Sequence, residues 1–132
     1  MSMIPEDLRY STDHEWVKVE GKQAVIGITD YAQSELGDIV YLELPDVGTE
    51  VVTEEELTEI ESTKTTSPVL SPISGKIVEV NEELRESPQL INDDPYGKGW
   101  IVTMKITNAE DLDALMSAKE YDEFISEGSD DE

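Results

Sequence analysis

The sequence predicts a mostly β protein with short helices, and three observations support this expectation. Short runs in which apolar and polar residues alternate recur from residue 15 to residue 106, as in strands with one buried face. Turn residues separate nearly all of these runs, at Pro68, Pro72, Ser74-Gly75 and residues 92–95. Helical spacing dominates only in the last part of the chain. Together these patterns favour a compact sandwich or barrel of short strands.

The first elements are a hairpin and a short helix. Residues 15–19 and 24–28 alternate and are joined by a turn around Gly21, which predicts a β-hairpin. Thr29 or Asp30 can cap a helix that runs through Leu36, and Gly37 ends it at a position suited to left-handed backbone. One helix therefore interrupts the strands.

The middle of the chain predicts further strands. Residues 39–44 form an apolar-rich run that ends at Pro45, and residues 46–48 are expected to form a turn. More short strands are expected around Val51 and at residues 57–61, 65–70, 76–80 and 101–106.

The last third changes to helical spacing. Thr107 or Asn108 can cap a helix, and a second helical stretch covers residues 118–125. The side chains expected to face the body are Leu112, Leu115, Met116, Tyr121, Phe124 and Ile125. No internal boundary is evident, so residues 1–128 are predicted to form one domain and residues 129–132 a disordered acidic tail.

Charge restricts the partners. The chain has 132 residues, with 32 acidic and 9 basic side chains and a formal charge of −23. Such a surface repels phosphate backbones and anionic headgroups, which argues against binding to nucleic acid or membranes. Self-repulsion of this size is tolerable where salt screens it, which suggests a salt-loving (halophilic) source.

Several kinds of chemistry are excluded by residues that are missing. The absence of cysteine excludes disulfides, thiolate nucleophiles and thiolate metal sites. His14 is the single histidine, so metal sites with several histidines are excluded and a packing role is expected for it. Residues 92–94 are interpreted as an ordinary loop rather than a weak calcium site. Without a signal peptide or an apolar span of membrane length, the chain is expected to lie in the cytoplasm. It is also expected to be a monomer.

The clearest candidate site is Lys64. It lies in a run of small hydroxylated residues between two predicted strands, so it should project into solvent from a hairpin tip. A solvated lysine amine is mostly protonated at neutral pH and is not a nucleophile by itself. Any chemistry at Lys64 would therefore come from an activated acyl group delivered by a ligase. From spacing alone, the simpler interpretation of Lys64, as one of nine solvated surface cations, is favoured.

A resemblance over nearly the whole chain favours the functional interpretation. Residues 61–64 (Glu-Ser-Thr-Lys) and 71–77 (Ser-Pro-Ile-Ser-Gly-Lys-Ile) resemble the lipoyl-lysine hairpin and following turn of the glycine cleavage system H proteins. Further matching segments follow in the same order: 14–17 (His-Glu-Trp-Val), 27–32 (Gly-Ile-Thr-Asp-Tyr-Ala), 36–40, 87–92, 94–97 (Asp-Pro-Tyr-Gly), 99–100 and 118–121. Short lipoyl and biotinyl domains share the lysine hairpin but lack the other segments.

The resemblance implies a barrel-sandwich hybrid fold with an N-terminal hairpin and C-terminal helices, and a carrier rather than an enzyme. It implies one covalent lipoate, as N6-lipoyllysine, at Lys64. Glu61, Ser62, Thr63 and Glu15 would support the hairpin or the arm. The implied partners are a pyridoxal-phosphate-dependent glycine decarboxylase, a tetrahydrofolate-dependent aminomethyltransferase, dihydrolipoyl dehydrogenase, and a lipoate ligase or lipoyltransferase.

Two other functions remain open at this point. The chain could carry lipoate for a 2-oxoacid dehydrogenase or a lipoate-relay pathway, because partner identity depends on surfaces that one sequence does not reveal. It could also be an unmodified interaction domain of the same fold, although such a domain would be expected to have lost Lys64.

Overall fold

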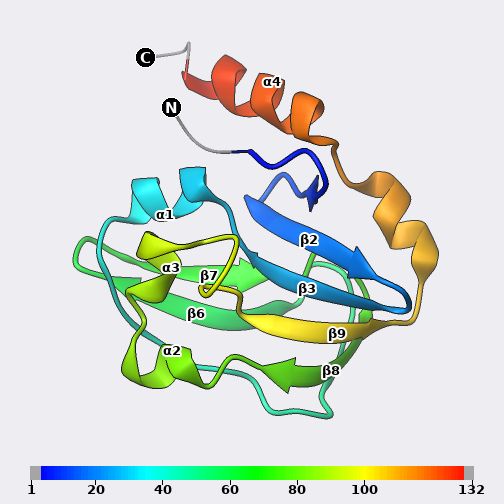
Figure 1. Ribbon diagram of the computed structural model, residues 1–132, viewed down its shortest axis with the longest axis horizontal. Helices are drawn as coiled ribbons and strands as arrows, with labels where there is room; N and C mark the ends of the chain where they lie inside the picture. The colour runs from blue at the N-terminus through cyan, green and yellow to red at the C-terminus, as the bar shows by residue number, and fades with distance from the viewer. Residues whose placement is uncertain (1–3, 130–132) are drawn as a thin grey trace.

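The computed structural model describes residues 4–129 and contains two β-sheets with short helices around them (Figure 1). The six-stranded sheet has the order β1-β2-β3-β9-β8-β5, and the three-stranded sheet has the order β4-β6-β7. All strand pairs are antiparallel. The strands are β1 (Arg9–Tyr10), β2 (Glu15–Glu20), β3 (Gln23–Ile28), β4 (Ile39–Leu42), β5 (Glu50–Val51), β6 (Glu56–Ser62), β7 (Thr66–Leu70), β8 (Gly75–Val80) and β9 (Val102–Ile106).

The helices are short except at the C-terminal end. They are α1 (Asp30–Leu36), α2 (Glu83–Glu86), α3 (Leu90–Asp93), a 3₁₀ helix η1 (Ala109–Ala114) and α4 (Ala118–Ser129). Helix α1 begins as its sequence predicts, because the Thr29 side chain accepts a hydrogen bond from the backbone N–H of Ala32. It ends at Gly37, whose φ of 85° lies in the left-handed region that favours glycine.

The main core lies between the two sheets. Ile26 of β3, Ile60 of β6 and Ile77 of β8 are fully buried in one apolar cluster, so both sheets share it. Alternation along the second half of β6 explains part of this, because Thr58, Ile60 and Ser62 are buried while Glu59 and Glu61 are exposed. Leu57 is also buried in the core, beside the register shift between Glu56 and Thr58. The sheets do not close into a barrel, and the architecture is mostly β with short helices, as predicted.

A second apolar cluster attaches the C-terminal helix. Leu8, Tyr10 and Trp16 pack with Tyr121 and Ile125 of α4, which lies across the N-terminal segment in Figure 1. The rings of Tyr10 and Tyr121 stack with centroids 4.7 Å apart. Both tyrosines are fully buried, so α4 is an integral part of the fold.

Several local expectations were wrong. Pro68 lies inside β7 rather than in a turn, which is possible because β7 is an edge strand. Residues 83–86 and 90–93 form single helical turns where no helix was expected. The segment after Asn108 is a 3₁₀ helix that stops at Ala114. Helix α4 continues through Ser129, the first residue of the predicted tail, and residues 130–132 lie outside the described residues.

Within residues 4–129, no helix is long and apolar enough to cross a membrane. The same part of the chain contains no group of three or more potential histidine, aspartate or glutamate metal ligands.

Candidate functional site

Lys64 lies at the tip of the hairpin formed by β6 and β7, as the sequence predicts. Ser62, which is buried, organises the turn. Its hydroxyl accepts hydrogen bonds from the backbone N–H groups of Lys64 (3.2 Å) and Thr65 (3.1 Å) and donates to the Thr65 carbonyl at 3.0 Å. One side chain therefore satisfies most of the polar backbone of the bend.

The turn is exposed on its outer side. Glu61, Thr63 and Lys64 are all solvent-exposed. Figure 1 shows the bend between β6 and β7 projecting at the left of the molecule, below α1. An exposed amine on a well-defined turn fits covalent attachment of a prosthetic group, because a modifying enzyme can reach it without opening the fold.

The tip nevertheless contacts the body at one place. The backbone N–H of Thr63 donates to the carbonyl of Asp38 at 3.0 Å. The methylene chain of Lys64, its stem, lies over Gly37, since a Cβ added to this glycine would be 3.2 Å from the lysine Cε. Access to the amine and restraint of its stem therefore occur together.

Glu15 is placed differently from the other predicted residues. It is only 2% exposed, at the start of β2. Its Oε1 accepts from the Ser11 hydroxyl at 2.7 Å and its Oε2 from the backbone N–H of Leu70 at 3.2 Å. Burial raises the pKa of Glu15 to about 8, and the hydrogen bond from Ser11 offsets only part of this effect.

Glu15 and Lys64 are therefore at opposite ends of the hairpin. Leu70 is the last residue of β7, and six residues of extended chain span about 20 Å. Glu15 supports the hairpin strand through Leu70 in this structure and does not lie beside the lysine.

His14 takes a structural position. Its Nδ1 lies 2.9 Å from the hydroxyl of Tyr121, which also lies 2.7 Å from Oγ1 of Thr29. Burial lowers the pKa of His14 below its ordinary value. These contacts join the start of β2 to α1 and α4, in agreement with the packing role expected for this histidine.

A match to a family model decides the classification. The model described as "Glycine cleavage H-protein" matches residues 8–128. The chain belongs to this family.

Curated relatives agree over almost their whole length. The glycine cleavage system H protein of Carboxydothermus hydrogenoformans is 52% identical over 127 residues, covering 96% of this chain and 98% of the relative. That of Coprothermobacter proteolyticus is 56% identical over 125 residues, with coverages of 94% and 98%. The Bacillus subtilis protein is 52% identical over 124 residues, also with 94% and 98%.

A solved structure supports the fold. The crystal structure of a glycine cleavage system H protein from Mycobacterium marinum superposes with a TM-score of 0.82 at 41% identity, and covers 89% of this chain and 95% of that one. The barrel-sandwich hybrid prediction is confirmed in this sense, with facing sheets that leave the barrel open. As a member of this family, the chain is a non-catalytic carrier protein of the glycine cleavage system.

Sequence reasoning missed how the fold supports the site. It assigned Gly37 to the end of a helix and Asn92 to a loop, and placed both in segments that match the family, without connecting either to the lysine. No local signal connects either residue to Lys64, since residues 37 and 64 meet only in the folded chain.

Proposed function

We propose that Lys64 carries one covalent lipoate and that the chain moves the aminomethyl group of glycine between the enzymes of the glycine cleavage system. The observation that carries this proposal is the position of Lys64, exposed at the tip of a hairpin whose turn Ser62 organises. Family membership supports the same role.

The residues of the chain provide attachment and tethering. When bound, lipoate supplies the disulfide and dithiol chemistry that this cysteine-free chain lacks. The β6–β7 hairpin holds the attachment point on two strands, so the arm starts from a fixed position. Tethering keeps the carried group at a high effective concentration for each successive enzyme.

The proposed partners are the four that the resemblance implies. A pyridoxal-phosphate-dependent glycine decarboxylase loads the carrier, and a tetrahydrofolate-dependent aminomethyltransferase unloads it. Dihydrolipoyl dehydrogenase reoxidises it, and a lipoate ligase or lipoyltransferase attaches the arm. We further propose that the chain is a monomer in the cytoplasm of a salt-adapted cell, and its formal charge of −23 supports the salt adaptation.

Intact-mass measurement of the protein from its native host tests the attachment. We expect a single lipoyl addition on wild type and none on Lys64→Arg, which keeps the positive charge but removes the primary amine. Wild-type protein that remains bare in cells containing lipoate and its ligase would contradict the proposal and favour an unmodified interaction domain.

Reconstitution with glycine decarboxylase tests the pathway. The lipoylated chain should support exchange between glycine and bicarbonate, and Lys64→Arg should not. A lipoylated chain without exchange activity would instead indicate service to a 2-oxoacid dehydrogenase or a lipoate relay.

A further inference from the structure

The turn that follows α1 is the surface on which the lysine tip rests. Two contacts define it: the Asp38 carbonyl accepts from the N–H of Thr63 at 3.0 Å, and the Lys64 stem lies over Gly37. A lysine stem packed along a fixed surface keeps its charged end in solvent while losing part of its freedom of movement. The geometry of residues 37–38 therefore sets where the Lys64 side chain begins its path into solvent.

Asn92, from α3, holds this turn on both sides. Its Nδ2 donates to the Gly37 carbonyl at 2.9 Å and to Oε1 of Gln33 at 2.9 Å. Its Oδ1 accepts from the N–H of Ile39 at 2.9 Å. The Gly37 carbonyl lies just past the end of α1, where the helix leaves carbonyls without partners. A single amide thus bridges the end of α1 and the start of β4.

We propose that Asn92 is a positioning residue for Lys64: by fixing the turn at residues 37–39, it holds the hairpin tip in the orientation needed for acylation. This inference rests on the proposed function. The hydrogen bonds of Asn92 go to Gln33, Gly37 and Ile39 rather than to Lys64, so it acts through the turn on which the lysine rests. A tip that is already ordered loses less freedom when the enzyme binds, and it presents its amine in line with the activated acyl group.

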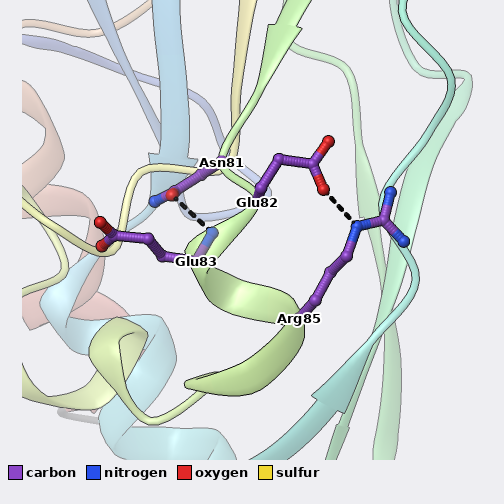
Figure 2. A network of polar contacts seen from close by, with 4 residues as sticks. All are labelled: Asn81, Glu82, Glu83 and Arg85. Carbon is purple, nitrogen blue, oxygen red and sulfur yellow. Dashed lines mark hydrogen bonds and ion pairs between the residues drawn. The ribbon is translucent and has the colours of Figure 1, made fainter.

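Asn81 provides a matched control, because its hydrogen bonds repeat those of Asn92 elsewhere. Its Nδ2 donates to the carbonyls of Lys98 and Trp100, both at 2.8 Å. Its Oδ1 accepts from the N–H of Glu83 at 3.3 Å, as Figure 2 shows at the start of α2. These bonds hold α2 and the segment before β9, and none of them involves α1 or the hairpin.

The matched variants are Asn92→Asp and Asn81→Asp. Each keeps the side-chain shape and the accepting oxygen but replaces the NH₂ donor with an oxygen that repels the facing carbonyl. Both should reduce stability, whereas only Asn92→Asp should disturb the lysine tip.

The experiment measures acylation of the full-length bare chain by a lipoate–protein ligase with lipoate and ATP, with initial rates followed by intact mass over a range of chain concentrations. We expect kcat/KM for Asn92→Asp to fall about tenfold, with a deficit that persists at saturating chain concentration. Asn81→Asp should be acylated at the wild-type rate. Amide hydrogen exchange at Thr63 and Ile39 should be faster in Asn92→Asp than in wild type. The amides of Ala24 and Met104, which lie opposite each other in β3 and β9, should keep the rank order of protection that they have in wild type.

A second route disturbs the turn and leaves Asn92 in place. Gly37→Ala puts a methyl group within 3.2 Å of the Lys64 Cε at a residue with φ of 85°, and should also lower kcat/KM. If Asn92→Asp fails to fold, a wild-type rate for Gly37→Ala overturns the inference, because it shows that disturbing this turn does not affect acylation.

The outcomes separate the two proposals. Three results would overturn the role of Asn92 and leave the proposed function in place. The first is a folded Asn92→Asp that is acylated as fast as wild type. The others are an equal loss of rate in both asparagine variants and a wild-type rate for Gly37→Ala. A wild-type chain that accepts no lipoate would overturn the proposed function together with this inference.

Discussion

Burial gives Glu15 a protonation behaviour unlike that of an ordinary glutamate. It is a carboxyl group buried at the start of β2 that accepts from Ser11 and Leu70, and its pKa is raised from 4.5 to about 8 by burial. Around neutral pH it is therefore largely protonated. Any role for Glu15 as an anion beside a loaded arm would first require that proton to leave.

This shift predicts how stability depends on pH. Between pH 4.5 and about 8 the folded chain keeps a proton on Glu15 that the unfolded chain has released. Raising the pH through this interval therefore favours unfolding, and the contribution of Glu15 to stability is largest below pH 4.5. Glu15→Gln keeps a neutral group of similar shape and removes this dependence. The stability of Glu15→Gln relative to wild type should rise by about 3 kcal/mol from pH 5.5 to pH 8.

Urea denaturation at constant ionic strength measures this difference. Glu20→Gln, at the exposed end of the same strand, is the control and should follow the wild-type pH profile. Parallel profiles for wild type and Glu15→Gln would show that the buried carboxyl does not hold its proton.

The residue scale also shows what a sequence can reveal about the site. Lys64, Ser62 and Thr63 are adjacent in the chain, so their arrangement in one turn follows from local pattern and turn chemistry. Asn92 lies 55 residues from Gly37, and only the packing of α3 against α1 brings them within hydrogen-bond distance. Its amide could be recognised as a support of the lysine tip only after the fold was known.

Among the elements, α1 and α4 are coupled through one hydroxyl. The Tyr121 hydroxyl of α4 contacts Thr29, which caps α1, and His14, which precedes β2. Replacing Tyr121 with phenylalanine would remove this hydrogen-bond partner from the partly buried His14 side chain and the fully buried Thr29 side chain. We expect Tyr121→Phe to reduce the free energy of unfolding by about 1–3 kcal/mol.

Chemical denaturation of the two variants Tyr121→Phe and Tyr41→Phe checks this expectation. Tyr41 is 54% exposed on β4, so losing its hydroxyl should change stability very little. Equal effects of the two substitutions would mean that the Tyr121 hydroxyl does not stabilise the docking of α4.

Elements with their own start and stop signals could be predicted, and those without them could not. Alternation predicted the β2–β3 hairpin, and Thr29 and Gly37 predicted both ends of α1. Helices α2 and α3 have four residues each, too few to show a helical period, and the side chains of their N-cap residues, Glu82 and Gln89, make no capping hydrogen bond. The surrounding tertiary structure, rather than local preference, holds them.

At the scale of the whole molecule, charge dominates. A formal charge of −23 is opposed by few cations, and the ion pairs Lys18–Glu20 (3.5 Å) and Arg85–Glu82 (2.5 Å) lie at exposed positions. Exposed pairs of this kind stabilise a fold by only about 0–1 kcal/mol each. Repulsion among the remaining carboxylates therefore acts against the compact state in dilute buffer.

Added salt should stabilise the fold for this reason. The Debye length falls from about 30 Å at 0.01 M to about 3 Å at 1 M ionic strength. We expect the urea midpoint to rise steadily over this range, to a similar extent in NaCl and KCl because screening depends mainly on ionic strength. A midpoint that stays constant from 0.01 M to 1 M would show that the charge is tolerated without screening, and would remove the support for a salt-adapted source.

The proline inside β7 has a consequence for behaviour at high concentration. β7 is an edge of the three-stranded sheet, and exposed strand edges invite pairing with another copy of the chain. Pro68 has no N–H, so a strand approaching this edge meets a break in the series of donors needed for a continuous ladder. The hairpin that must stay accessible to other proteins is thereby made a poor template for fibre growth.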